Sequence, residues 1–381
     1  MKIKNPITYF YDELRDRIAN YGGIHNAHLH LDRAGTLDER YMEEIGHRIL
    51  ESSHISLSKK HSLIATLHAG PAYEQEDLQL RINSCLDIMV ACNTRRADTL
   101  VDVTADRVGL SALRLMQEIK TARKSDIELR IGAYTPLGFL DGEPERWDLF
   151  VEGAKEADFV AALPEADDKD DYPDHIGFEE HCQRVLSVAQ DKQCMIHVHT
   201  DQRNEPGERG TERLIEFLDR KGSYQPQTGE PLIWAVHMIS PSTYDDSRFE
   251  SLVKGLLRHN IGVICCPSAA IGMRQLRPMM TPTYNSIPRV LELLAEGVEV
   301  RLASDNIADI CSPSTTANLI DEIFVLSAAV RFYHIDILAK LATGCSLSDQ
   351  DRDHIHDHLE KNRWETQKAI NGSRTKTDIR G

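Results

Sequence analysis

Short apolar segments alternate with longer segments of helical pattern along the chain. Eight short segments are almost continuously apolar, which is typical of strands in a parallel sheet that helices cover on both faces. Between them, apolar residues recur with the three- and four-residue spacing of a helix, as at Phe249, Leu252, Val253 and Leu256. The eight expected strands span residues 23–30, 100–104, 128–133, 159–163, 195–199, 232–237, 261–266 and 298–303.

Strands that alternate with helices in this number favour a (β/α)8 TIM barrel over an open sheet. About seventy residues separate the first two expected strands, including a polar helical stretch at 41–61, which predicts extra helices near the barrel mouth. The charged segment after Gly344 predicts a helix over about 347–370. We therefore divide the chain into a barrel at residues 1–346 and a C-terminal helix with a polar tail at 347–381.

Composition and charge exclude several kinds of partner. The 381 residues carry 44 Lys and Arg against 60 Asp and Glu, a net charge of -16 without a basic block, so we expect no nucleic-acid partner. No apolar run approaches the ~20 residues that span a bilayer, and the first residues lack the apolar region of a signal peptide, so we expect no membrane partner. Eight cysteines without a CxxC motif indicate reduced thiols in a cytoplasmic protein.

Histidines and a carboxylate end four of the expected strands. Residues two apart in a strand point to the same side, so His28 and His30 face one spot. In a barrel, the carboxyl ends of the strands form the active-site face. A single histidine at a strand end is usually a hydrogen-bonded structural residue, and one HxH pair usually occurs by chance. The placement of such residues at four strand ends together favours a site for zinc or ferrous iron. The residues concerned are His28, His30, His197, His199, His237 and Asp305.

The same strand ends carry a resemblance to a known family. The stretches at 28–32 (HLHLD), 198–202 (VHTDQ), 235–238 (AVHM), 304–309 (SDNIAD) and 316–318 (TAN) resemble those of the amidohydrolase superfamily, most of all its cytosine deaminase branch. The similarity runs from about residue 24 to about residue 344. It implies a metal-dependent hydrolase with a small-molecule substrate. Such barrels often associate, so we also allow for a homo-oligomer.

The resemblance implies one divalent metal, zinc slightly favoured over iron. It implies that His237 hydrogen-bonds and polarises the catalytic water, and that Asp305 takes its proton and passes it to the leaving amine. His197 lies one pleat deeper than His199; it supports the ligands from behind or replaces His199 as a ligand. No lysine ends the fourth expected strand, so we expect no bridging carbamate and one metal rather than two. The implied ligands are His28, His30, His199 and Asp305.

The sequence departs from the family pattern at three places. Gln202 stands where these deaminases have a glutamate that protonates a ring nitrogen; an amide can hold a substrate but cannot shuttle a proton, and Asp201 is the alternative donor. Pro136 stands where the cytosine-acting members have a glutamine, so cytosine itself is not the expected substrate. The β-sandwich that usually accompanies the barrel in this family is missing. A bare barrel with extra helices resembles the layout of adenosine deaminase more. Gln202 joins His237 and Asp305 as catalytic candidates, and the weaker substrate-contact candidates are Tyr134, Pro136, Asp201, Asn306 and Arg274.

The sequence is compatible with three functions. The first is hydrolysis of a C–N bond in a small, cyclic or heteroaromatic compound, by deamination or by amide or ring opening. The second is hydrolysis of another bond, such as a lactone or a carbon–halogen bond, with the same activated water. The third is a catalytically inactive metal-binding barrel, against which the presence of both His237 and Asp305 argues.

Overall fold

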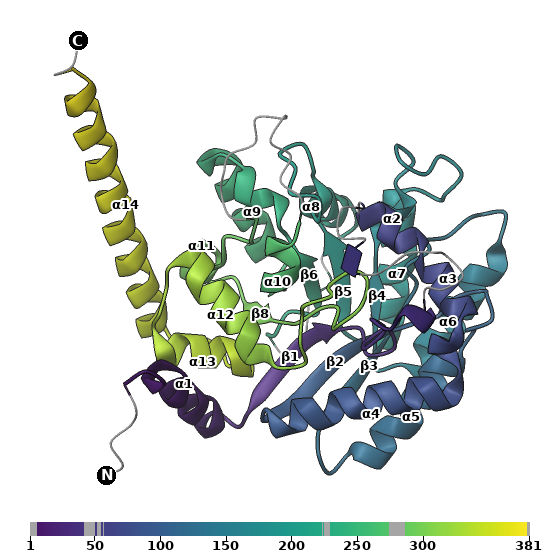
Figure 1. The fold of residues 1–381 in the computed structure, drawn as a ribbon. Helices are drawn as coiled ribbons and strands as arrows, with labels where there is room; N and C mark the ends of the chain where they lie inside the picture. Colours follow the sequence, from purple (N-terminus) through teal and green to yellow (C-terminus); the bar gives the residue numbers. More distant parts are fainter. Residues whose placement is uncertain are drawn as a thin grey trace.

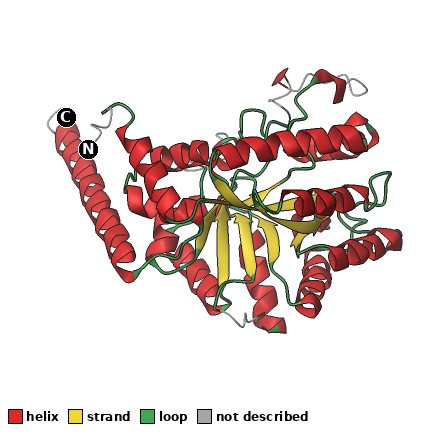
Figure 2. Cartoon of the chain, turned by 90° about the horizontal axis from the view of Figure 1, so that it is seen from below, coloured by secondary structure: helices red, strands yellow, loops and turns green. Residues whose placement is uncertain are grey.

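A computed structural model describes residues 6–41, 50–51, 55, 57–222, 224, 229–273 and 286–378. Within them, eight parallel strands follow one another in the order β1 to β8 around a nearly closed barrel, with helices on the outside (Figures 1 and 2). The strands are β1 (Ile24–Leu29), β2 (Thr94–Asp102), β3 (Glu128–Tyr134), β4 (Phe159–Ala162), β5 (Ile196–Thr200), β6 (Ile233–His237), β7 (Ile261–Cys265) and β8 (Val300–Leu302).

A parallel bridge between Leu29 and Asp305 brings the two edges of the sheet together. The predicted (β/α)8 barrel is thus confirmed, and each of the eight apolar segments overlaps one strand. Alternation along each strand divides the core in two. In β6, Ile233 and Ala235 pack into the layer shared with the helices, whereas Trp234 and Val236 belong to the separate cluster that fills the barrel interior.

The start of β2 differs most from the predicted strands, because β2 begins at Thr94 instead of residue 100. Asp98 is fully buried in this first half of the strand, which an apolar pattern does not anticipate. Its carboxylate accepts two hydrogen bonds from Arg96 and lies 3.0 Å from Nε2 of His25. A buried charge is tolerated where it is paired and hydrogen-bonded, so polar residues continue the strand here.

Several helices lie between β1 and β2, which confirms the extra helices that the long connection predicts. The helix α2 brings His61 to the cavity at the barrel mouth. The helices are α1 (Tyr9–Asn20), α2 (Leu57–Ser62), α3 (Ile64–Ala69), α4 (Gln75–Ala91), α5 (Ser111–Arg123), α6 (Pro144–Glu156), α7 (Phe178–Lys192), α8 (Gly210–Lys221), α9 (Asp246–Arg258), α10 (Pro267–Ile271), α11 (Val290–Ala295), α12 (Leu319–Val330), α13 (Ile335–Thr343) and α14 (Asp349–Asp378).

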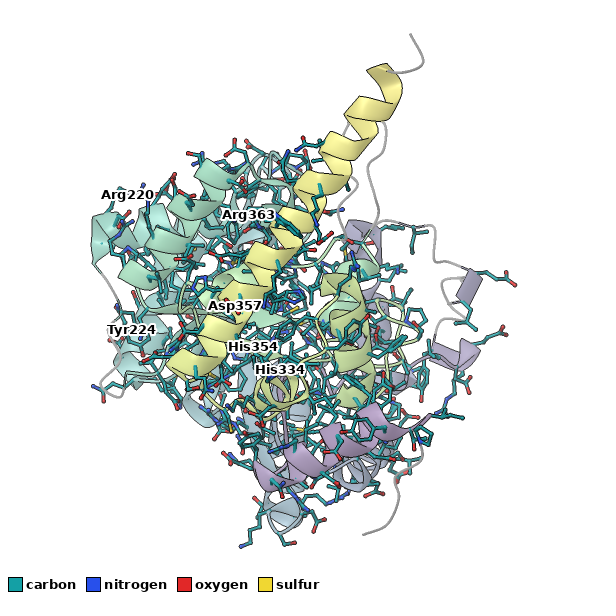
Figure 3. All side chains as sticks on the ribbon, turned by 90° about the vertical axis from the view of Figure 1, so that its left-hand side faces the viewer. Arg220, Tyr224, His334, His354, Asp357 and Arg363 are labelled. Carbon is teal, nitrogen blue, oxygen red and sulfur yellow. The ribbon has the colours of Figure 1, made fainter. Side chains whose placement is uncertain are left out.

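The C-terminal helix α14 projects away from the barrel (Figure 1). Its base is held by the buried Ile355 and by His354, whose ring lies 4.2 Å from that of His334 (Figure 3). Further out, Trp364 is 59% exposed. The helix ends at Asp378, beyond the predicted end near 370. The division of the chain at 346 and 347 stays a prediction. Among the described residues, no helix is long and apolar enough to cross a membrane.

Candidate active site and metal centre

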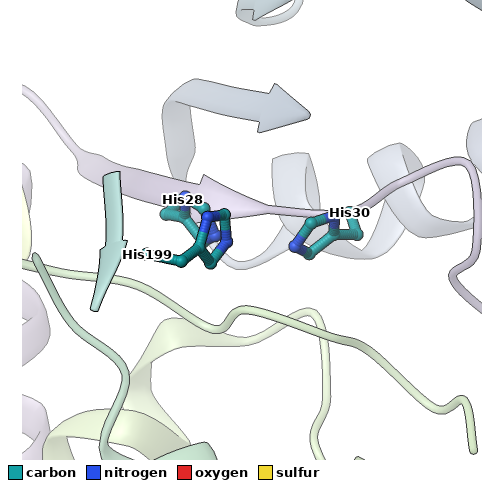
Figure 4. A group of neighbouring side chains, drawn as sticks. All are labelled: His28, His30 and His199. Atoms are coloured by element: carbon teal, nitrogen blue, oxygen red, sulfur yellow. The ribbon is translucent and has the colours of Figure 1, made fainter. Parts of the chain in front are cut away.

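Three histidines from two strands meet at the carboxyl end of the barrel. His28 lies in β1, His30 directly follows it, and His199 lies near the end of β5 (Figure 4). One ring nitrogen from each lies within 4.8 Å of the others, and all three side chains are buried. The parallel strands bring these residues together because the same end of every strand faces the barrel mouth.

A second buried group adjoins the three histidines. It consists of His237 at the end of β6, Cys266 directly after β7 and Asp305 after β8, with ligand atoms again within 4.8 Å of one another. Asp305 links the two groups, since its Oδ1 lies 3.5 Å from Nε2 of His30 and 3.9 Å from Nε2 of His28. His237 and Asp305 both have left-handed backbone, with φ of 79° and 59°, a strained conformation that clusters at functional sites.

The hydrogen bonds of His28 and His199 leave one nitrogen of each ring available to a cation. Nδ1 of His199 donates to the carbonyl oxygen of Ala162, 3.0 Å away. Nδ1 of His28 lies 3.0 Å from Nδ1 of His197, and Nε2 of His28 is buried without a hydrogen-bond partner. When His28 presents its Nε2 lone pair, its proton lies on Nδ1 and is donated to His197. The donor set and this orphaned atom fit a divalent metal.

His30 is arranged differently. Nη2 of Arg33 donates a hydrogen bond to Nδ1 of His30, so the proton of the neutral imidazole lies on Nε2. A cation at Nε2 therefore requires this hydrogen bond to be released. Arg33 is itself buried, and its Nε lies 3.8 Å from a carboxylate oxygen of Asp102.

A buried ion network lies next to Arg33. Nε2 of His68 lies 3.1 Å from Asp102, Nδ1 of His68 lies 2.7 Å from Asp106, and Tyr73 donates to both Asp102 and Asp32. Burial alone lowers the pKa of His68, but the hydrogen bonds to Asp102 and Asp106 outweigh it and raise this pKa to about 9. His68 is therefore a cation at neutral pH and neutralises carboxylates that would otherwise be buried unpaired.

This network predicts a pH dependence of stability. The folded-state pKa of His68, about 9, lies above its unfolded value of 6.5, so its contribution is complete below pH 6.5 and is lost as the pH rises to about 9. The loss is on the order of 3 kcal/mol, from 1.36 kcal/mol per pKa unit. In calorimetry, we expect the melting temperature of the wild type to fall across this range more steeply than that of His68→Gln. Equal slopes would contradict the assignment.

Four residues of the two groups line a narrow cavity at the barrel mouth, namely His30, His199, His237 and Asp305. Burial lowers the pKa of His237 to about 4 and raises the pKa of Asp305 to about 6. A separate surface cavity of about 470 Å³ lies between α1 and α12, and none of the strand-end histidines lines it. The lining of the mouth cavity comprises His30, Arg33, His61, Tyr134, His199, Gln202, His237, Ile239, Ala269, Met273, Asp305, Asn306, Cys311 and Ser312.

Three of the predicted polar contact residues line this cavity, namely Gln202, Tyr134 and Asn306. The ring of Tyr134 lies 5.1 Å from that of His199, and Nδ2 of Asn306 donates to Oδ1 of Asp305. Pro136 is buried and does not belong to the lining. Arg274 lies outside the described residues.

Asp201 has a different place from the one predicted. Its carboxylate accepts hydrogen bonds from the backbone N–H groups of Gly210 and Thr211 and from the Thr211 hydroxyl, at the start of α8. It is fully buried and is absent from the cavity lining. The expectation of a substrate contact or a proton donor at Asp201 is therefore corrected, because the carboxylate already serves the first turn of a helix.

The sequence analysis did not predict four residues of the site: Arg33, His61 and Cys311 line the mouth cavity, and Cys266 lies beside His237 and Asp305. Arg33 follows the HLHLD stretch directly, and Cys266 ends an expected strand, so position alone was a signal for both. His61 and Cys311 come from long connections, for which a strand-end rule offers no signal.

Two curated proteins resemble the chain in sequence. An uncharacterised protein of Haemophilus influenzae is 27% identical over 77% of this chain and 98% of its own length. A pterin deaminase of Rhizobium rhizogenes is 22% identical over 68% of this chain and 55% of its own length. No protein family model matches the chain.

Solved structures share the fold. A 5-methylcytosine deaminase from Klebsiella pneumoniae, liganded with phosphonocytosine, aligns with a TM-score of 0.71 and 22% identity over 88% of this chain and 75% of its own. An atrazine chlorohydrolase from Arthrobacter aurescens, complexed with zinc, aligns with a TM-score of 0.51 and 14% identity over 85% and 70%. The chain therefore shares its barrel fold with these hydrolases and is similar in sequence to a pterin deaminase.

Proposed function

We propose that this protein hydrolyses a C–N bond of a small cyclic or heteroaromatic compound, by deamination or by amide or ring opening, with one zinc or iron ion. The observation that carries the proposal is the meeting of two buried ligand groups at Asp305, beside an Nε2 atom of His28 that lacks a partner. The pterin deaminase relative and the methylcytosine deaminase fold support this class of chemistry.

The metal would be held by His28, His30, His199 and Asp305. When bound, a divalent zinc or iron would supply Lewis acidity that brings the pKa of a water molecule to about 7. His197 holds the ring of His28 in place through the Nδ1 contact of 3.0 Å and is a support, not a ligand.

His237 and Asp305 handle the protons. Burial lowers the pKa of His237 to about 4, so the ring is neutral. A neutral imidazole that lines the cavity can accept a hydrogen bond from water or donate one to it. The buried carboxylate of Asp305 takes a proton from water and returns it to a leaving nitrogen.

Gln202 binds the substrate without transferring a proton. Its amide lines the cavity, and amides donate and accept hydrogen bonds but do not titrate. Asp201 does not replace the missing glutamate, because its carboxylate faces α8. The lack of an acid that protonates a ring nitrogen favours a second candidate function, hydrolysis of a lactone or carbon–halogen bond, because that reaction does not need this proton transfer.

Ammonia release from a panel of aminated pterins, pyrimidines and triazines tests the proposal. Deamination predicts release from at least one member, whereas product formation without ammonia from lactones or halogenated rings favours the second candidate. Absence of turnover on the whole panel by a metal-loaded protein favours the inactive barrel.

Gln202→Glu is expected to raise ammonia release by about tenfold or more, because it restores an acid that can protonate a ring nitrogen. Gln202→Met is the matched control, since it keeps the length of the side chain and removes its polarity. Equal rates for the glutamate and methionine variants would contradict the role assigned to this position.

A further inference from the structure

Cys266 belongs to the wall of the site, although neither the proposed metal ligands nor the proposed proton transfers use it. It follows β7 directly, its side chain is 1% exposed, and its Sγ lies within 4.8 Å of a ring nitrogen of His237 and a carboxylate oxygen of Asp305. Three strands therefore place a thiol, an imidazole and a carboxylate around one point.

The neighbouring Cys265 has the opposite orientation. Cys265 packs in the core layer shared with the helices, whereas Cys266 packs with Trp234, Tyr134 and Ala269 in the interior cluster. Successive residues at a strand end point to opposite faces, so of these two thiols only that of Cys266 faces the barrel interior, beside His237 and Asp305. Cys265 is thus a matched control of the same residue type and burial.

The chemistry of the three donors favours thiophilic cations. Thiolate with imidazole and carboxylate suits zinc and related metals, whereas magnesium and calcium prefer sites built from oxygen alone. The three histidines beside it lack sulfur, so a metal–thiolate signal reports on the second group alone.

We propose that His237, Cys266 and Asp305 form a second metal site, which binds a thiophilic divalent cation such as zinc or cadmium and inhibits the protein when filled. On binding, the Cys266 S–H bond breaks, an S–metal bond forms and one proton passes to the solvent. The purified protein keeps one metal at the histidine site, and the second cation enters only when it is in excess.

Inhibition follows from the residues that this cation occupies. It takes the lone pair of His237 and a carboxylate oxygen of Asp305, the two groups that handle protons in the proposed reaction. The inhibitory part of this inference rests on the proposed function, whereas the binding part does not.

Binding is tested by titrating cadmium chloride into the purified protein while recording cadmium–thiolate charge-transfer absorption and proton release. We expect a saturable band in the wild type that corresponds to one cation and one proton per chain. The band should persist in Cys265→Ala and in Cys311→Ala, whose native thiol lines the mouth cavity, and disappear in Cys266→Ala and Cys266→Ser. A band that survives in both Cys266 variants, or no band in the wild type at saturation, overturns the site.

Inhibition is tested separately, with excess zinc and an active substrate. Half-inhibition of Cys266→Ala is expected to need at least about tenfold more zinc than that of the wild type. Equal sensitivity overturns the inhibitory role. Because the absorption measurement needs no turnover, failure of the proposed reaction and failure of this second site are distinguishable.

Discussion

His237→Asn is expected to lower kcat by about 10²–10⁴, the usual contribution of a positioned acid–base group, while the metal content stays near that of the wild type. The ring is buried at the end of β6, and burial lowers its pKa to about 4, so the native residue is a neutral imidazole beside Asp305. Asparagine keeps some hydrogen-bonding capacity but does not reproduce the imidazole's position or basicity.

The two readouts together distinguish a role in proton handling from a role as a ligand. Steady-state kinetics and elemental analysis are made on the same preparation, at equal protein concentration. If the asparagine variant loses its metal together with its activity, His237 is a ligand of the resident metal, and the role proposed for it is wrong.

Asp305→Asn is expected to lower turnover by at least about 10², even after reconstitution with zinc or iron. The amide has the shape of the carboxylate but cannot take up a proton, and it removes the negative charge that links the two ligand groups. A weaker affinity for metal is also expected, so the comparison is made at saturating metal.

Asp309→Asn is the matched control for this change. Burial also raises the pKa of Asp309 to about 6, but its carboxylate accepts backbone hydrogen bonds from Cys311 and Ser312 and belongs to neither ligand group. We expect this variant to retain most of its activity. Equal losses in the two variants would mean that buried charge near β8, and not proton transfer by Asp305, explains the effect.

The barrel was predictable because each strand contains apolar residues that stand out in the hydrophobic pattern of the sequence. The positions of the site residues were predictable for the same reason, because the carboxyl ends of all strands in a barrel lie on the same face. These residues are His28, His30, His199, His237 and Asp305. The first half of β2 was not, because Asp98 is buried through pairing with His25 and Arg96, and such pairing depends on contacts far apart in sequence.

Side-chain roles beyond the strand ends depended on packing. Asp201 is adjacent to the predicted contact Gln202, yet the start of α8 captures its carboxylate. Cys265 and Cys266 are adjacent in sequence, and only their alternation in three dimensions shows that the Cys266 thiol lies beside His237 and Asp305. Arg33 contacts His30 because the chain turns back after β1.

Inductively coupled plasma mass spectrometry of the wild type and of His28→Ala/His30→Ala tests whether the three strand-end histidines hold a metal. We expect close to one zinc or iron per wild-type chain and a metal-free double variant that circular dichroism shows to be folded. A wild type without metal after reconstitution, or a folded double variant with an equal metal content, would contradict this expectation.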